Sequence, residues 1–393
     1  MDAYQAIVIG GGIGGLSAAL ALHRRGIPVT VHERAASLEP VGAGLALAPN
    51  ALRALDRLGV GERLRALATA HPAIGLRHPS GRWLARTDTA TFEARFGETI
   101  TAVARADVIA ALVDALPDGT VRTNSPAALV TPGGTTEPAV VRTPDGDRPA
   151  ALVVAADGLR SATRAQLFPQ HPGPRYSGFT TWRTIVSPTR RPDAVGEVWG
   201  RGQLAGVVPL ADGRVYVYGA ALAPAGARAA DGDEKAELLR RYGTWCAPVP
   251  QLLALAEPGR VLRHDVWDLS DPLPAYHHGR VALLGDAAHA MCPFQGQGAC
   301  QAIEDAVVLA SALTPAADSA TTLPAYTAAR LPRTTAIVTG SRRIGGLVAL
   351  RTPAATRLRD AALTLAGLLP ARTLLNRSAR TYNWQPPALD ATA

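Results

Sequence analysis

Six residues near the start of the chain, Gly10–Gly15, have the composition of a turn that binds phosphate. They follow a short apolar segment and precede a segment with helical apolar spacing, so a strand, a turn and a helix are expected. Gly10 would permit the tight bend, Gly12 would let the backbone approach a pyrophosphate, and Gly15 would let the helix pack on the strand. N–H groups at the helix N-terminus would bind the anion. The spacing therefore predicts a dinucleotide site; a purely structural glycine turn is the alternative.

An acidic residue follows the next predicted strand, residues 28–32. Glu33 stands where a carboxylate can accept hydrogen bonds from ribose hydroxyls, and it disfavours a 2′-phosphate. The strand–turn–helix–strand unit takes about 30 residues, as a βαβ crossover requires. The first 35 residues therefore predict a site for the adenine half of FAD or NAD.

A second motif, Asp157-Gly158, follows the apolar segment 151–155. With Ser161 and Arg164 at helical spacing, it could hold a loop near the pyrophosphate. Asp-Gly is also a common turn and Ser161 a common helix cap, so a structural role is the alternative.

A third motif, Gly285-Asp286, follows the apolar segment 281–284. Asp286 would lie at the carboxyl end of a buried strand, where α/β proteins bind ligands, and could accept from ribityl hydroxyls. Residues 296–298 would begin a helix whose N–H groups face the edge of a flavin. For Glu304 and Asp305, further along that helix, a solvent-facing or capping role is the simpler interpretation.

Together, the three motifs resemble the class A flavoprotein monooxygenases, the family of p-hydroxybenzoate and salicylate hydroxylases. The resemblance covers essentially the whole chain, and it includes the segment 41–51. It implies an FAD-dependent monooxygenase that hydroxylates a small aromatic or heteroaromatic substrate with NAD(P)H and O2, through a flavin C4a-hydroperoxide. Arg105 and Asp286 would contact FAD, and Asp157 would serve both FAD and the passing nicotinamide cofactor. The predicted cofactor-binding residues are Gly10, Gly12, Ile13, Gly14, Gly15, Glu33, Arg34, Gly44, Leu45, Arg105, Val130, Asp157, Gly285, Asp286, Gly296, Gln297 and Gly298.

Substrate contacts are expected from a β-rich middle region. Trp182 and Arg183 lie on one predicted strand, and because side chains alternate, only one of the two can face the cleft squarely. Arg183 would pair with a carboxylate or phenolate, or else form a surface salt bridge. The aromatic candidates would line the pocket or pack in the core. The predicted substrate residues are Trp182, Arg183, Trp199, Tyr216 and Pro293.

Three residues are predicted to act in catalysis: Pro293, His289 and Arg183. Pro293 would lie over the flavin edge. His289 could help to deprotonate a phenol near neutral pH, or it could simply be held by backbone in a turn. No cluster has the spacing of metal ligands, so no metal is expected.

These motifs require an α/β architecture with two closely joined domains. A discontinuous Rossmann-like FAD-binding domain (1–72, 98–174 and 279–330) would surround an inserted mixed β-sheet substrate domain (73–97 and 175–278). A C-terminal helical segment (331–393), interrupted by prolines such as Pro332, would follow.

The composition narrows the function further. The chain has 393 residues and a net charge of +8, of which residues 340–393 carry +6 with eight Arg and two Asp. This basic segment lacks interleaved aromatic residues, so a solvated helix face is expected and no nucleic acid partner; a patch for an anionic cofactor, partner or membrane surface is the alternative. Three widely spaced cysteines and the lack of a signal peptide favour a cytoplasmic location. No apolar stretch of about 18 residues occurs, so no transmembrane segment is expected. A monomer or a homodimer is expected.

Three alternatives stay open at this point. Another flavin reaction on the same fold, such as epoxidation, Baeyer–Villiger insertion or oxidative decarboxylation, fits the motifs equally well. A non-catalytic flavin-binding protein would need a damaged oxygen site. A membrane-associated hydroxylase of lipid-like substrates would use the basic C-terminal segment as its anchor.

Overall fold

A central parallel sheet forms the first half of the molecule in the computed structural model, which describes residues 5–38, 44–67, 73–190, 192, 196–313 and 318–389. Six strands lie in the order β17-β18-β11-β1-β2-β7, and only the edge strand β17 runs antiparallel to its neighbour. All residues of β1 and β11 are buried, as strands covered on both faces require. The bounds are β1 (Ala6–Ile9), β2 (Val29–His32), β7 (Val121–Arg122), β11 (Leu152–Ala155), β17 (His277–His278) and β18 (Val281–Leu283).

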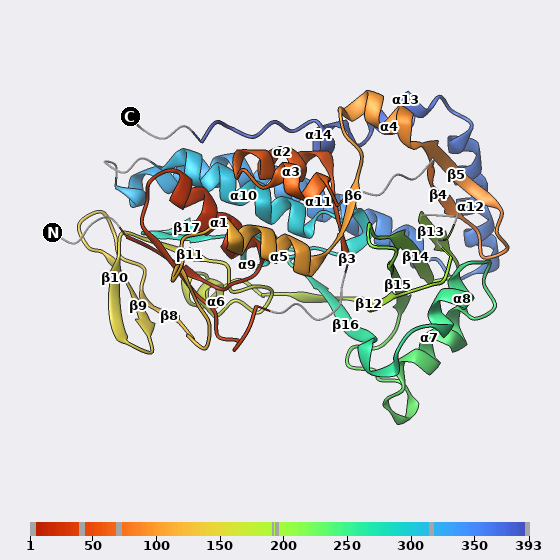
Figure 1. Cartoon of the computed structure of the whole chain (residues 1–393), viewed down its shortest axis with the longest axis horizontal. Helices are drawn as coiled ribbons and strands as arrows, with labels where there is room; N and C mark the ends of the chain where they lie inside the picture. The colour runs from red at the N-terminus through yellow and green to blue at the C-terminus, as the bar shows by residue number, and fades with distance from the viewer. Residues whose placement is uncertain are drawn as a thin grey trace.

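Helices cover one side of this sheet and a small sheet covers the other (Figure 1). The helix α1 packs on α10 and α5, and α10 packs on α2. These helices are α1 (Ile13–Arg24), α2 (Pro49–Arg57), α3 (Gly61–Arg65), α5 (Arg105–Asp114), α6 (Ala162–Leu167), α9 (Asp286–His289) and α10 (Gly298–Ala312). The small sheet contains β8 (Ala128–Thr131), β9 (Ala139–Thr143) and β10 (Gly146–Ala150). Segments far apart in the sequence form this half together, because β18 pairs with β11 and α10 packs on α1.

A seven-stranded mixed sheet forms the second half, in the order β16-β12-β15-β14-β13-β4-β5. Its strands are β4 (Ala73–Arg77), β5 (Trp83–Asp88), β12 (Arg175–Val186), β13 (Gly196–Trp199), β14 (Gln203–Pro209), β15 (Val215–Leu222) and β16 (Leu262–Asp268). One face packs on α7 (Glu234–Tyr242) and α8 (Val249–Ala254). The other face meets a two-stranded antiparallel sheet of β3 (Gly44–Leu47) and β6 (Thr101–Ala104). The helix α4 (Thr89–Phe96) follows β5.

The C-terminal residues are helical, as predicted, but the first helix is longer than expected. The helix α11 (Ser319–Val348) runs through Pro332 without interruption. A proline removes only one helical hydrogen bond, and the side chains of Arg330 and Arg333 on either side are anchored to Glu304 of α10. The remaining helices are α12 (Pro353–Gly367), α13 (Ala371–Asn376) and α14 (Ala379–Tyr382).

The predicted α/β class, with a Rossmann-like sheet, an inserted mixed sheet and a helical C-terminal segment, is confirmed. The early strands β4 and β5 belong to the second sheet through pairing with β13. The domain boundaries themselves stay a prediction. Among the described residues, no helix is long and apolar enough to cross a membrane.

Candidate active site

The glycine turn joins β1 to α1, as the sequence predicts. Gly10 has φ +108°, and a Cβ there would lie 2.4 Å from the carbonyl oxygen of Ala156. A Cβ on Gly15 would lie 1.9 Å from the carbonyl oxygen of Gly10. At Gly12, by contrast, a Cβ would meet no described atom within 4 Å. Packing explains the glycines at both ends of the turn, whereas the open space at Gly12 fits a ligand beside the helix N-terminus.

Glu33 holds the turn through its carboxylate. The backbone N–H of Gly11 donates to Oε2 at 2.7 Å, and that of Ala35 donates to Oε1 at 2.8 Å. Arg34, beside it, is exposed. A carboxylate has lone pairs for further donors, and the ribose contact of Glu33 stays a prediction.

Asp157 lies where β11 ends and has one oxygen to spare. Its Oδ2 accepts a hydrogen bond from the N–H of Thr163 at 3.1 Å. Its Oδ1 is buried and has no hydrogen-bond partner among the described residues. A buried carboxylate oxygen without a donor is costly, so this atom fits a ligand hydroxyl or water.

Arg164 joins the second motif to the third. Its guanidinium, which is 4% exposed, donates to the carbonyl oxygens of Leu159 at 2.7 Å and Ala287 at 3.0 Å. Burial lowers the pKa of Arg164, while Asp157 and Asp286 raise it. Arg164 therefore fixes one loop against the other. Ser161 is the N-cap of α6 and accepts from the N–H of Arg164 at 2.8 Å, which is the structural role that the sequence left open.

Arg105 and Asp286 lie on two different helices, and the charges of Asp286 and of Arg183 in the second sheet both act on Arg105. Arg105 begins α5 and Asp286 begins α9, and both side chains are exposed. Burial by surrounding protein nevertheless lowers the pKa of Arg105, Asp286 raises it, and Arg183 lowers it further. Since Arg183 belongs to β12, charged side chains from both halves of the molecule act on Arg105.

A helix N-terminus faces this region from the third motif. Gly296 has φ +63° and open space around its Cα, and α10 begins two residues later at Gly298. Gln297 is buried and accepts from Asn50 Nδ2 at 3.0 Å, but its own Nε2 has no partner among the described residues. Pro293 is exposed in the preceding turn.

Trp182 and Arg183 lie on opposite faces of β12, and only Arg183 is on the side of the FAD-binding half. Trp182 is 3% exposed, packs in the core under α7, and donates from Nε1 to Glu234 Oε2 at 2.7 Å. Its indole packs on the side of α7, and the predicted substrate contact of Trp182 stays a prediction. Arg183 is on the opposite face, which it shares with Phe179 and Ile185.

Tyrosines from β15 lie on that same face. Tyr216 and Tyr218 have ring centroids 5.3 Å apart. A Cβ on Gly44 would lie 2.5 Å from Tyr216 Cγ, so the glycine lets the β3–β6 sheet pack closely on this ring. Leu45 and Val130 are partly buried in β3 and β8. Tyr216 therefore lies between the two halves, and its substrate contact stays a prediction.

Glu197 of β13, two strands from β15 in the sheet, adds a polar group to this face that none of the motifs predicts. Its carboxylate accepts from Trp199 Nε1 and from Tyr218 Oη, each at 2.7 Å. Burial raises the pKa of Glu197, and these two hydrogen bonds oppose the rise. Trp199 is 7% exposed in a cluster with Phe179, and its substrate contact is likewise untested. The i, i+2 spacing of an acid and a tryptophan on one predicted strand was the available signal.

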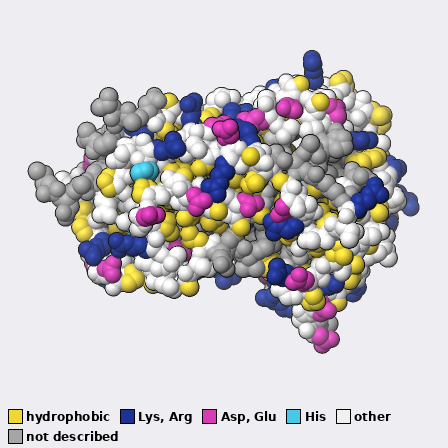
Figure 2. Space-filling model, viewed as in Figure 1, with side chains coloured by type: hydrophobic (Ala, Val, Ile, Leu, Met, Phe, Trp, Pro, Cys, Tyr) yellow, Lys and Arg dark blue, Asp and Glu magenta, His cyan; other side chains and the backbone are white. Residues whose placement is uncertain are grey.

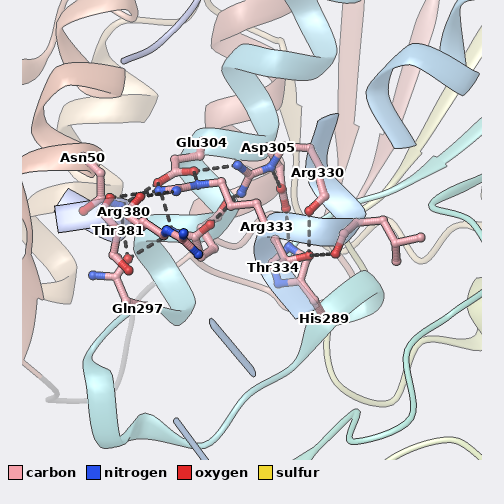
Figure 3. Close-up of polar contacts among 12 residues, drawn as sticks. Asn50, His289, Gln297, Glu304, Asp305, Arg330, Arg333, Thr334, Arg380 and Thr381 are labelled. Carbon is pink, nitrogen blue, oxygen red and sulfur yellow. Dashed lines mark hydrogen bonds and ion pairs between the residues drawn. The ribbon is translucent and has the colours of Figure 1, made fainter. Parts of the chain in front are cut away.

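Glu304 and Asp305 are wholly buried, which corrects the solvent-facing interpretation. They join α10 to α11 through Arg330, whose Nη1 lies 2.5 Å from Glu304 Oε2 and whose Nε lies 2.6 Å from Asp305 Oδ1. Arg333 and Asn50 also bind Glu304 (Figure 3). We call this set of paired side chains, Asn50, His289, Glu304, Asp305, Arg330 and Arg333, the α10–α11 network.

His289 belongs to this network and not to the open side of the site. It is 2% exposed, and its Nε2 lies 2.6 Å from Asp305 Oδ2. Burial alone would raise the pKa of Asp305, but His289 and Arg330 beside it lower that pKa to about 2. A carboxylate, and not the backbone of a turn, therefore holds the ring of His289 inside the protein, and its predicted contact with a substrate stays a prediction.

Two further observations concern the residues around the site and its capacity to hold a metal ion. The segment 41–43, part of the resemblance, lies outside the described residues. Within the described ranges, no group of three or more His, Cys, Asp or Glu side chains is arranged to hold a metal ion.

Comparison with known proteins decides the family. A family profile described as an FAD binding domain matches residues 3–341. The chain belongs to this FAD-binding family. Aurachin C monooxygenase/isomerase of Stigmatella aurantiaca is 36% identical over 86% of this chain and 88% of its own. A 3-amino-4-hydroxybenzoate 2-monooxygenase of Streptomyces platensis is 37% identical over 91% and 92%. A solved Klebsiella pneumoniae structure with FAD and uric acid has a TM-score of 0.87 and 29% identity, covering 96% of each chain.

These relatives confirm the predicted family, the FAD cofactor and the class of FAD-dependent monooxygenase. The residues present also fit the cofactor on structural grounds alone. The open space at Gly12, the unpartnered oxygen of Asp157 and the N-termini of α1 and α10 together suit a molecule with a pyrophosphate, hydroxyls and a flavin. Individual contacts to FAD stay predictions.

Proposed function

We propose that this FAD-dependent monooxygenase uses NAD(P)H and O2 to hydroxylate a small, anionic aromatic or heteroaromatic substrate where the two sheets meet. One observation carries the proposal: Arg183 lies on the face of β12 and β15 that packs on β6, and β6 ends directly before Arg105. The relatives named for 3-amino-4-hydroxybenzoate and the structure with uric acid support a small ring substrate with acidic groups.

FAD would bind along the three motifs. The N-terminus of α1 would bind the pyrophosphate, Asp157 and Asp286 would accept from hydroxyls, and the N-terminus of α10 would face the flavin. Bound FAD, reduced by NAD(P)H, supplies the activation of O2. The chain's own task is then to orient the substrate ring and to exclude water.

Arg183 would orient the substrate by pairing with its carboxylate or ring oxyanion. The apolar contact between Phe179 and Phe294, with ring centroids 4.9 Å apart, closes the junction of the two halves beside Pro293. The carboxyl of Glu197, held by Trp199 and Tyr218, gives the same face of the sheet a hydrogen-bonding group at a fixed position. A cytoplasmic location suits the three free cysteines, Cys246, Cys292 and Cys300.

The test is NADH and NADPH oxidation by the FAD-loaded protein across hydroxybenzoates, aminohydroxybenzoates, purines and neutral phenols, with H2O2 measured in parallel. An anionic ring compound should accelerate cofactor oxidation with little H2O2, and mass spectrometry should find the product heavier by one oxygen atom. Acceleration by neutral rings alone would contradict the proposed anion specificity. Products of epoxidation or ring insertion would identify another monooxygenase reaction on this fold.

Arg183→Ala tests the substrate contact. KM for the anionic substrate should rise about 10- to 100-fold with FAD content unchanged, because one charge-assisted hydrogen-bond pair is lost. Arg175→Ala is the matched control, since Arg175 lies on the same strand but pairs with Asp271 at the surface. Equal KM values in the two variants would return Arg183 to a structural role.

A further inference from the structure

The helix α12 has the reverse of the usual amphipathic pattern. Its buried residues are polar: Thr356, Arg359 and Asp360. Its exposed residues include Leu358 at 74% and Leu365 at 66%. These two leucines are seven positions apart, which places them on one face of the helix two turns apart. A surface helix of a soluble protein normally turns its apolar face inward, so this face needs an explanation.

The exposed leucines continue on both sides of α12. Leu347 at the end of α11, and Leu368 and Leu369 after α12, are 43%, 78% and 45% exposed. Of the seven large hydrophobic side chains that are exposed among the described residues, five fall between positions 347 and 369. Single exposed leucines are ordinary, but a cluster of this kind marks an interaction surface. We call Leu347, Leu358, Leu365, Leu368 and Leu369 the leucine face.

Positive charge surrounds the leucine face. Residues 340–389 contain eight arginines and one acid, Asp360, which is buried against Arg359 with an Nη2–Oδ1 distance of 2.8 Å. Arg351, Arg357 and Arg372 are exposed. Figure 2 shows Lys and Arg side chains among hydrophobic ones at the right-hand edge, where α12 lies in Figure 1. No exposed acid within this segment offsets these charges.

Neighbouring elements add further cations to the same side. Arg82, before β5, donates to Thr364 Oγ1 of α12 at 3.2 Å. A groove of about 380 Å³ opens beside α12, and Arg201, Arg357 and Trp245 are among the residues that line it. Arginines at a groove beside an apolar face suit phosphate groups that stand next to lipid chains.

We propose that the leucine face docks on the surface of a lipid bilayer that contains anionic lipids, with α12 lying in the plane of the interface. Leucine side chains would enter the boundary between headgroups and acyl chains, and the arginines around them would bind lipid phosphates. A second copy of the chain is a poorer occupant, because a two-fold contact would set the same arginines against each other. The inference is independent of the proposed substrate, since the leucine face is on the exposed side of this segment, whereas Arg359 and Leu363 of α12 pack on the other side against Trp199 and Phe179.

The test is co-sedimentation of the FAD-loaded protein with vesicles of phosphatidylcholine alone and with about one third phosphatidylglycerol. The protein should pellet with the anionic vesicles, and 0.5 M salt should release much of it. Replacing Leu358, Leu365 and Leu368 together by Ser should weaken binding by at least about 100-fold, because three buried leucines are lost. Leu255→Ser is the matched control: Leu255 is 50% exposed after α8 and is not part of the leucine face, so its variant should bind as the parent does.

Light scattering and enzyme assays separate the outcomes. The triple variant should keep its FAD and its oxidation of NAD(P)H with a water-soluble substrate, so a loss of vesicle binding alone supports the proposal. A parent protein that stays in the supernatant with both vesicle types overturns it, as does a triple variant that binds equally well. A dimeric parent that binds no vesicles, together with a monomeric triple variant, would assign the leucine face to a second copy.

Discussion

The glycine turn and the α10–α11 network lie in the same half of the molecule, but they differ in whether the buried carboxylates beside them have partners. In the network, Glu304 and Asp305 are wholly buried and each pairs with Arg330, although Asn50 Oδ1 and His289 Nδ1 have no partner among the described residues. At the turn, Gly12 leaves open space and Asp157 Oδ1 has no partner among the described residues. Closed polar pairs stabilise the fold, whereas unsatisfied groups beside open space indicate where a ligand completes the structure.

The largest expected effect comes from breaking the closed network. Arg330→Met should lower the free energy of unfolding by about 3–5 kcal/mol, because it leaves two buried carboxylates without their shared cation. Arg142→Met, which removes an exposed pair with Asp147, should leave it nearly unchanged, because solvent screens such a pair. Urea unfolding of both variants measures the difference.

A rescue variant keeps that test decisive if Arg330→Met does not fold. Adding Glu304→Gln and Asp305→Asn removes the unpaired charges and should recover soluble protein. If Arg330→Met were as stable as Arg142→Met, the network would have no structural role.

The second prediction compares two glycines of the turn. Gly15→Ala should cost about 1–3 kcal/mol of stability, because its methyl group would meet the carbonyl oxygen of Gly10. Gly12→Ala should leave the stability of the apoprotein unchanged, since Gly12 has φ −75° and open space, but should weaken FAD binding about 10- to 100-fold. Thermal unfolding of the apoproteins and titration with FAD separate the two effects. Unchanged FAD affinity in Gly12→Ala would place the cofactor elsewhere.

The sequence predicts the glycine turn well because everything that defines it is local. Strand, turn and helix follow one another within 25 residues, and the steric reasons at Gly10 and Gly15 are those expected from the motif. Alternation on β12 likewise predicts that Trp182 and Arg183 face opposite sides. It does not say which side is which, because that depends on α7, which follows some 50 residues later and covers Trp182.

The network could not be predicted from local pattern. Two adjacent acids on a helix resemble a solvated face until Arg330, 25 residues away on another helix, is placed between them. The same partner explains why α11 continues through Pro332, where proline alone predicts a break. The contact that holds His289 is equally non-local, since its carboxylate partner Asp305 is contributed by a different helix.

The smallest effect concerns acid stability. Asp305 has a pKa lowered to about 2 in the folded protein by His289 and Arg330, which overcome the effect of burial, whereas an unfolded Asp titrates near its usual value. A lowered folded pKa contributes stability that is present above the unfolded pKa and is lost as pH falls through the folded pKa. Between pH 5 and pH 3, Asp305 should therefore account for about 1 kcal/mol of the fall in the free energy of unfolding.

Urea unfolding of the parent protein, Asp305→Asn and Asp118→Asn from pH 7 to pH 3 measures this share. Asp305→Asn should be less stable at pH 7 but should lose less stability on acidification, because the amide has no proton to gain. Asp118→Asn, at an exposed turn, should follow the parent curve. If the Asp305→Asn curve ran parallel to that of the parent, the carboxylate would not be ionised inside the network, and the α10–α11 contact would depend on neutral hydrogen bonds in place of ion pairs.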